Sequence, residues 1–413
     1  MPKIGKFPRF GKRFFRLARK LVGACHFQHF WRVVVAIAGM HGRRSLNRMQ
    51  RLCKGRRTRQ AIADFLKKAQ WEAPEVLQQK ALELHKQLGC RSGDLVYLLL
   101  DDTQQRKRAK RMDAVQKLFL HAEKVYATGH IILTAALCFR GVVIPYRTSL
   151  WAGEEFCAAS ENQPDPADHV TFRKLTQLAS DALDAIRLPS GVKGIALFDS
   201  YYLCPAVTQA CQRQGFRWVS MCKKNRNFFP DRRDWDKRKV SRYGKNVVER
   251  EGRVQTVKGK SYRLAQRVGR LSKAGRVKLV FSRRNKEKKW VALATNETRW
   301  SVKTVLSHYV NRWGIEVLFK MSKQHLGLGD YQLLRYRGIE RYLCLVLIAY
   351  LLLTHLAILQ ADAQANSNEL KLPSIPQLQE ELRSQLWDDV ISGLESSKRH
   401  KTTARKIKDI IQL

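Results

Sequence analysis

The first 60 residues of this 413-residue chain contain no aspartate or glutamate, but they contain 17 lysines and arginines. The whole chain has 35 acidic residues against 78 basic ones, a formal charge of +43. Acid is also scarce in residues 223–289, where 6 Asp/Glu accompany 25 Lys/Arg. A polyanion is therefore the expected partner. Charge alone leaves DNA, RNA and an anionic membrane open, because all three carry phosphates that attract lysine and arginine.

Paired cysteine motifs and a secretion signal are also missing. The nine cysteines are scattered without a CxxC pair, which argues against a zinc finger and for a reducing compartment. The apolar stretch after Lys20 is interrupted at His26, so it is shorter than the apolar region of a signal peptide. A basic, acid-free start also resembles an organellar transit peptide. We expect a cytoplasmic protein.

Long apolar runs are limited to one, from Tyr342 to Leu359. This run is about as long as a membrane span. It contains Thr354 and His355, and it directly follows an amphipathic helix. A helix that is apolar all round is either buried or membrane-spanning. We interpret this one as a buried core helix and expect no membrane partner.

The pattern of residues 1–90 predicts short basic helices. Apolar residues recur at helical spacing over residues 27–39, Ser45 is placed to cap a second helix, and Thr58 can open a third that reaches about Trp71. Tight turns between such helices suit a helix-turn-helix-like DNA-binding module. A small helical bundle with solvated arginines is the alternative.

From Leu95 the pattern becomes that of a mixed α/β core. LVYLLL is a short apolar run that indicates a buried strand, and it ends at Asp101 and Asp102. A second apolar strand is expected to end at Asp199. The other predicted elements are a hairpin of strands 131–139 and 142–149, helices 168–187 and 203–214, and a strand at 216–221.

The order of these elements predicts a ribonuclease-H-like mixed sheet. A basic insertion with alternating stretches is interpreted as mainly β, and a long helix from Ser301 to about Gln324 follows it. The predicted regions are an all-α DNA-binding region (1–90), a catalytic core in two parts (91–222 and 296–362), the insertion (223–295) and a helical tail (363–413).

Carboxylates follow two strands of this predicted sheet. In an open α/β sheet, ligands gather where strands end, so Asp102 and Asp199 can converge there. Oxygen ligands that leave water positions open suit Mg²⁺ or Mn²⁺. Two such ions about 4 Å apart can activate a nucleophile and stabilise the leaving oxygen of a phosphodiester.

The predicted long helix carries a third carboxylate within a stripe of donors. Tyr309, Arg312, Glu316 and Lys323 lie at offsets 0, 3, 7 and 14, which places them on one helix face. A metal ligand beside donors to phosphate oxygens suits a scissile-phosphate site. Taken alone, Arg312 and Glu316 could be a surface pair worth about 0.3 kcal/mol, and Asp199 could simply cap the following helix.

The spacing Tyr-x2-Arg-x3-Glu-x6-Lys, abbreviated YREK, resembles the signature of bacterial insertion-sequence transposases of the DDE superfamily. DDTQ at 101–104 and LFDSYY at 197–202 are similar to their two aspartate motifs, and CKKNR at 222–226 also fits. The resemblance covers about residues 95–359. It implies that Asp102, Asp199 and Glu316 are the catalytic residues and hold two Mg²⁺ ions, for which Mn²⁺ can substitute.

The resemblance favours Asp102 over Asp101, because the family's aspartate directly precedes a threonine. Strand alternation allows only one of the two to face the metals. WVAL at 290–293 is similar to a Trp-x-x-Leu segment whose tryptophan stacks on a flipped base, worth about 1–3 kcal/mol. A plain core tryptophan is the alternative. The predicted DNA-binding residues are Tyr309, Arg312, Lys323, Trp290, Lys223, Lys224 and Arg226.

Together these features predict a cut-and-paste DNA transposase. Water frees a 3′-hydroxyl at each element end, this hydroxyl attacks the opposite strand to give a hairpin, and the reopened end joins target DNA. The resemblance implies double-stranded DNA (terminal inverted repeats and target), a synaptic homodimer and a bacterial, nucleoid-associated location. The alternatives are a ribonuclease-H-like nuclease or junction resolvase and a domesticated, non-catalytic DNA-binding protein.

Overall fold

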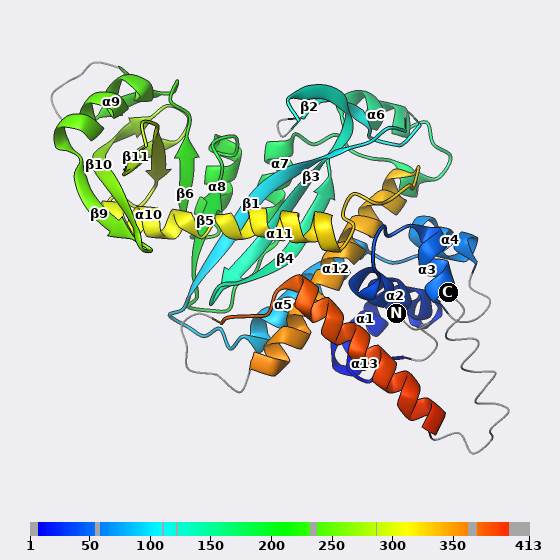
Figure 1. Ribbon diagram of the computed structural model, residues 1–413. Helices are drawn as coiled ribbons and strands as arrows, with labels where there is room; N and C mark the ends of the chain where they lie inside the picture. Colours follow the sequence, from blue (N-terminus) through cyan, green and yellow to red (C-terminus); the bar gives the residue numbers. More distant parts are fainter. Residues whose placement is uncertain are drawn as a thin grey trace.

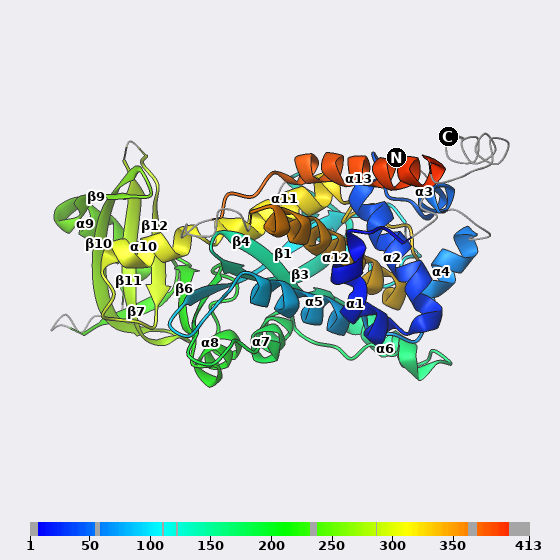
Figure 2. The same ribbon diagram turned by 90° about the horizontal axis from the view of Figure 1, so that it is seen from below.

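The strands of this chain form one large mixed sheet with helices on both faces (Figures 1 and 2). A cluster of helices from both ends of the sequence lies at one end of the molecule, and the insertion lies at the other. The predicted α/β class is therefore confirmed. The computed structural model describes residues 7–53, 58–109, 111–120, 123–231, 238–285, 287–361 and 370–395, and its sheet has 12 strands within them.

The centre of the sheet has the strand order of a ribonuclease-H-like core. Strand β1 (Leu95–Arg106) pairs antiparallel with β3 (Val125–Phe139), and β3 pairs antiparallel with β4 (Val142–Leu150). On its other side β1 pairs parallel with β5 (Lys193–Phe198), which pairs parallel with β6 (Arg217–Cys222). An antiparallel meander followed by parallel crossovers is the predicted arrangement.

Two crossover helices complete this core. Helix α7 (Leu175–Ala185) precedes β5, and α8 (Pro205–Arg213) connects β5 to β6. They lie against each other and against β3 and β6 respectively. The helix predicted from residue 168 begins only at Leu175, after a short 3₁₀ turn, η1 (Pro166–Asp168).

Strand β1 is longer than its apolar run predicts. The parallel pairing with β5 ends at Leu100, but the antiparallel ladder with β3 continues through Asp101 and Asp102 to Arg106. The polar half of β1 therefore belongs to the sheet on one side only. This half-paired stretch carries both aspartates at the point where a neighbouring strand stops.

The hairpin between β3 and β4 forms where predicted. Arg140 and Gly141 both adopt positive φ, 51° and 81°. Two consecutive residues of this kind make the tight turn whose twist matches that of the flanking strands. The hairpin thus fixes the register of the antiparallel edge of the core.

The insertion continues the same sheet instead of forming a separate one. Its last strand pairs antiparallel with β6, so the mainly β character is confirmed. The helix α9 departs from the prediction, because only a few apolar residues such as Val247 and Val248 mark its buried side. The elements are β7 (Asn227–Pro230), β8 (Arg238–Lys239), α9 (Val240–Glu251), β9 (Arg253–Val257), β10 (Lys260–Leu271), β11 (Gly275–Arg284) and β12 (Trp290–Thr295).

The segment predicted as one helix consists of two, α10 (Val302–Val310) and α11 (Trp313–His325). Ser301, where the helix was predicted to begin, caps α10, since its hydroxyl accepts a hydrogen bond from the Thr304 amide at 3.0 Å. The two helices run nearly end to end (Figure 1). The first packs against the insertion and the second against β1.

Asn311 interrupts the helix between α10 and α11. Its side-chain amide donates to the carbonyls of Ser307 and His308 at 3.0 and 3.2 Å. A short polar side chain that competes for backbone carbonyls loosens regular helical bonding. Lys258 of the insertion donates to the Asn311 side-chain oxygen at 2.8 Å, so the insertion contacts the helix at its break.

The apolar run lies in α12 (Tyr336–Ala361), around which the helical end of the molecule packs. By length and composition α12 could cross a membrane, but 89% of its most apolar 18-residue window is buried inside the protein. It contacts β4 and three N-terminal helices, α2 (Ala24–Gly39), α4 (Arg59–Lys67) and α5 (Ala73–Gln87). Packing within the protein accounts for the apolar character of this helix.

The N-terminal region has more helices than predicted. Ser45 caps α3 (Leu46–Leu52) and Thr58 caps α4, as expected, but α1 (Gly11–Val22) and α5 add to them. Helix α5 packs on β4 as well as on α12. The N-terminal helices therefore share a core with the sheet, and their role in DNA recognition remains a prediction.

The predicted helical tail is α13 (Ile375–Glu395), which contacts α2, α11 and α12. Its Gln379 side chain donates to the Ala38 carbonyl at the end of α2. The basic stretch 398–408 lies outside the described residues. The remaining elements are β2 (Gln116–Leu120) and α6 (Glu154–Ser160).

Candidate active site

Asp101 and Asp102 point to opposite faces of β1. Arg312 at the start of α11 donates to Asp101 Oδ2 at 2.7 Å, whereas the Tyr202 hydroxyl donates to Asp102 Oδ1 at 2.6 Å. This arrangement follows from the alternation of side chains along a strand. Asp101, and not the Asp102 favoured by the sequence, therefore lies on the face of the sheet that α11 covers.

The Arg312 guanidinium joins β1 to α11. Its Nη1 donates to Asp101 and its Nη2 to Glu316, one helical turn further on. The side chains of Arg312, Asp101 and Glu316 are 14%, 18% and 32% exposed. The planar fork of an arginine suits such charge-assisted bonds. A partly exposed Glu316 carboxylate is thus held next to a largely enclosed Asp101.

Asp199 lies at the same edge of the sheet. It directly follows Phe198, the last residue of β5, which pairs with Leu100 of β1. Its negative charge raises the pKa values of Asp101 and Arg312. The structure thus places Asp101, Asp199 and Glu316 around one guanidinium, at the strand ends where ligands of α/β sheets bind.

Burial disfavours a charged Asp101. It raises the pKa of this carboxyl to about 7; the Arg312 guanidinium opposes the rise, and the charges of Asp102 and Asp199 add to it. Burial and the neighbouring Asp102 carboxylate also raise the pKa of Tyr202, so its phenol stays protonated and can donate. The arginine therefore offsets only part of the negative charge collected at this edge.

Tyr309 and Lys323 lie on either side of Arg312 and Glu316. The Tyr309 hydroxyl is buried without a hydrogen-bond partner among the described residues, and burial raises its pKa to about 12. Lys323 donates to the Gln104 carbonyl of β1 at 2.7 Å. The four residues of the predicted stripe thus span the helix break, and two of them bond directly to β1.

The predicted residues of the insertion differ in their availability. Arg226 donates to the carbonyls of Leu203 and Ser272, so it links segments of the protein. Lys223 lies over the Tyr201 ring at 5.9 Å. Arg226 thus has a structural role. Lys223 and Lys224, the other two basic residues predicted to bind DNA here, do not take part in these two bonds.

Trp290 is packed within the insertion. Its ring meets α9 at Gly244, where an added Cβ would lie 2.1 Å from the ring, and it contacts Phe281 edge-on. The Lys224 ammonium lies 3.9 Å from the ring centroid. A base could reach this ring only after displacing that lysine.

Sequence reasoning missed two aromatic residues beside the carboxylates. Trp313 is 63% exposed and lies three residues before Glu316, and Tyr201 is 50% exposed two residues after Asp199. Large exposed aromatics at a charged site indicate a binding surface. Their position within the motifs was the only signal in the sequence, since periodicity does not distinguish an exposed tryptophan from a buried one.

The family comparison agrees with this geometry. The profile described as DDE superfamily endonuclease matches residues 26–300, more than half of the chain. The chain belongs to this superfamily. No curated protein matches it. The match includes both aspartate motifs and ends before α10, so the Glu316 side of the site rests on geometry and on the YREK resemblance.

DDE endonucleases generally use divalent metal ions, and the donors of this one suit such ions. Asp101, Asp199 and Glu316 supply hard oxygen ligands. As the side chains stand, no three His, Cys, Asp or Glu residues in the described part of the chain are close enough to hold one ion. Arg312 binds Glu316, so Glu316 would have to leave this arginine to act as a ligand.

A stability measurement tests whether burial and the neighbouring carboxylates make a charged Asp101 unfavourable in the folded protein. In EDTA, Asp101→Asn should raise the free energy of unfolding by about 1 kcal/mol and the melting temperature by about 2 °C, because a buried, repelled carboxylate is removed. The matched control is Asp181→Asn, which removes a carboxylate paired with Arg173 on the surface and should not stabilise the protein. A lower melting temperature for Asp101→Asn would contradict the electrostatics described above.

Proposed function

We propose that this DDE endonuclease is a cut-and-paste DNA transposase that uses Asp101, Asp199 and Glu316 as catalytic carboxylates. The observation that carries this assignment is the Arg312 guanidinium, which binds Asp101 and Glu316 from two elements beside Asp199. Asp102, which the sequence resemblance favoured, faces the other side of the sheet and supports Tyr202 instead.

The proposed roles follow from charge and position. Two bound Mg²⁺ ions, with Mn²⁺ as a substitute, would activate the attacking oxygen and stabilise the leaving oxygen. The three carboxylates orient this centre. Arg312, freed from Glu316, can donate its Nη2 arm to a phosphate beside the cut while Nη1 stays on Asp101. The buried Tyr309 hydroxyl and the Lys323 ammonium supply further donors along the same face.

The proposed substrate is double-stranded DNA, at terminal inverted repeats and at the target. Lys223 and Lys224 flank the site next to Tyr201 and Trp290, and the chain carries a formal charge of +43. Such a surface binds phosphates through counterion release. A synaptic homodimer, a hairpin intermediate and a nucleoid-associated bacterial location complete the proposal.

Substitution of the carboxylates is the direct test. Asp101→Asn, Asp199→Asn and Glu316→Gln should each abolish strand cleavage while leaving duplex binding within about twofold, because they remove metal ligands and not phosphate contacts. Cleavage by the purified protein should require Mg²⁺ or Mn²⁺ and stop in EDTA. The measurements are cleavage and strand-transfer assays on labelled element ends, with filter binding in parallel.

Asp102→Asn decides between the two adjacent aspartates. It keeps the size of the side chain, and it should retain measurable cleavage because Tyr202 can still donate to the amide oxygen. Inactive Asp102→Asn together with active Asp101→Asn would restore the sequence-based assignment. Cleavage without any joining of 3′ ends to target DNA would identify a nuclease or resolvase instead of a transposase.

Recognition of element ends by the N-terminal helices is tested without deleting them, because α2 and α5 pack on α12. Arg48 and Arg51 are exposed one turn apart on α3. The double variant Arg48→Gln/Arg51→Gln should weaken binding to terminal repeats and reduce the salt slope by about 2, since two phosphate contacts are lost. An unchanged slope would exclude α3 from the DNA interface.

Two tryptophans can be compared for hairpin formation, which unstacks a base at a cost of a few kcal/mol. Trp313→Ala should permit nicking but slow hairpin formation, because this ring is exposed next to Glu316. Trp290→Ala, the sequence-based candidate, should do the same only if Lys224 yields its place over the ring. A Trp290→Ala protein that loses thermal stability and nicking together would mark that residue as core. Gel assays separate nicked, hairpin and open products.

A further inference from the structure

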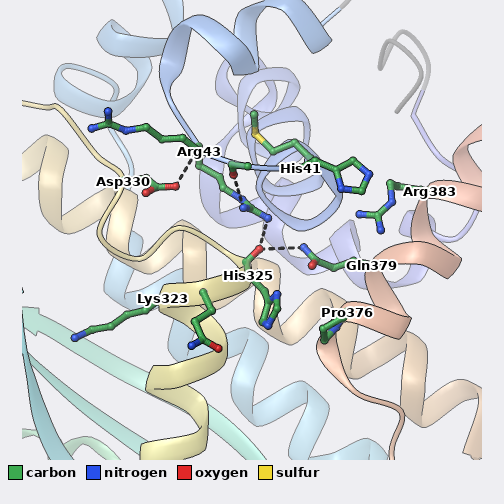
Figure 3. A pocket seen from close by; sticks show the side chains of 12 residues that line it. His41, Arg43, Lys323, His325, Asp330, Pro376, Gln379 and Arg383 are labelled. Carbon is green, nitrogen blue, oxygen red and sulfur yellow. Dashed lines mark hydrogen bonds between the residues drawn. The ribbon is translucent and has the colours of Figure 1, made fainter.

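A polar pocket lies at the C-terminal end of α11, the end of this helix that is distant from Glu316. It has a volume of about 450 Å³ and is formed by three segments distant in sequence: the loop 40–44 after α2, residues 323–325 at the end of α11, and α13. Figure 3 shows Arg43 and Lys323 reaching out on one side of it, and His41 and Arg383 on the other, with His325 and Gln379 between.

The lining of the pocket is strongly basic. Its charged side chains are Arg43, Arg44, Lys323 and Arg383 against Asp330, and two imidazoles add to them, His41 and His325. Glu380 beside the pocket pairs with Arg383 but is 74% exposed. Among the described residues that line the pocket there is no phenylalanine, tyrosine or tryptophan, so these residues offer no aromatic platform for a base. These features favour a phosphate group over a whole nucleotide.

Arg44 supplies a positive charge that is fixed in place at this pocket. It is 5% exposed, and its backbone amide donates to Asp330 at 2.8 Å. Its two terminal nitrogens donate to the carbonyls of Gly42 and His325. The remaining donor, Nε–H, is buried and has no hydrogen-bond partner within the described residues. A buried donor without a partner is costly, and this one has no surface open to the pocket, so Arg44 contributes a positive charge to the pocket and not a further hydrogen bond.

The position of the pocket suits the backbone of a DNA strand that is cut at Glu316. Lys323 lies seven residues after Glu316 on α11, which corresponds to about 10 Å at 1.5 Å per residue. A strand of duplex DNA rises 3.4 Å per nucleotide, so about three nucleotides cover that length. Lys323 contributes to both places, because it lines the pocket and bonds to β1 at Gln104.

We propose that this pocket holds one backbone phosphate of the bound DNA, about three nucleotides from the scissile phosphate. The bound phosphate bridges loop 40–44, α11 and α13, and so connects the two ends of the chain to the catalytic helix. This inference rests on the proposed function, since it assumes that DNA lies at Glu316.

The test combines one protein substitution with one neutral phosphate. Arg43→Gln is suitable because Arg43 is exposed. Uncut duplexes carrying a single methylphosphonate, moved from one to six nucleotides from the cleavage position, are bound in EDTA to the full-length protein. One neutral position near three nucleotides should weaken wild-type binding about tenfold. The same position should cost Arg43→Gln much less than tenfold, because the contact is already lost.

Two further variants keep the test decisive. Arg383→Gln should lose the response to the methylphosphonate at the same position. A general loss of positive charge would reduce the response at every position equally. Lys193→Gln removes an exposed charge at the start of β5, the opposite end of that strand from Asp199, and should keep the full wild-type response. Additive losses for every variant at every position would overturn the proposal. Circular dichroism melting checks that the variants are folded.

Inorganic phosphate separates the two sources of the same chemistry. Up to 10 mM inorganic phosphate should displace DNA no more than chloride at equal ionic strength, because a phosphate within a strand is held by its neighbours as well. Displacement specific to inorganic phosphate, lost in Arg43→Gln and without any methylphosphonate effect, would show a pocket for a free anion and refute the DNA assignment. Binding in EDTA does not require cleavage, so this result is independent of the carboxylate assignments.

Discussion

The Arg312 guanidinium lies between two carboxylates that belong to different parts of the chain, and the rest of the site depends on that contact. Asp101 lies on β1, within the sheet. Glu316 lies on α11, which follows the insertion in the sequence and packs against β1. Without a positive charge between them, two partly enclosed carboxylates would repel each other and the helix would lose its main polar contact with β1. The same guanidinium leaves Glu316 partly exposed, so a ligand can compete for this carboxylate.

The sheet gives this contact a rigid base. The parallel pairing of β1 with β5 stops at the pair Leu100–Phe198. Asp101 and Asp199 directly follow the two members of this last pair. Tyr202 fixes Asp102 on the opposite face. The pleat of one strand thus places two adjacent aspartates on opposite faces, Asp101 beside α11 and Asp102 against Tyr202 of the β5–α8 loop.

The sequence predicted most of the fold, because its signals were local. The apolar strands, the β3–β4 turn and the caps at Ser45 and Thr58 each depend on a few adjacent residues. The break at Asn311, and which of Asp101 and Asp102 faces α11, were beyond it. Both depend on what lies opposite in space: Lys258 and two carbonyls for the asparagine, Arg312 and Tyr202 for the aspartates. The packing of Trp290 under α9 has the same cause, since nothing in WVAL indicates that Gly244 will cover the ring.

Asp101 and Arg312 are 211 residues apart in the sequence, and the whole insertion lies between them. During synthesis, Asp101 and Asp199 are therefore present in the chain before α11, which carries Glu316, has been made. The terminal segments also depend on late synthesis, because α2 is contacted by α12 and α13. Contacts of such sequence separation form slowly. A chain that ends before α11 therefore lacks Arg312 and Glu316 and cannot form this site.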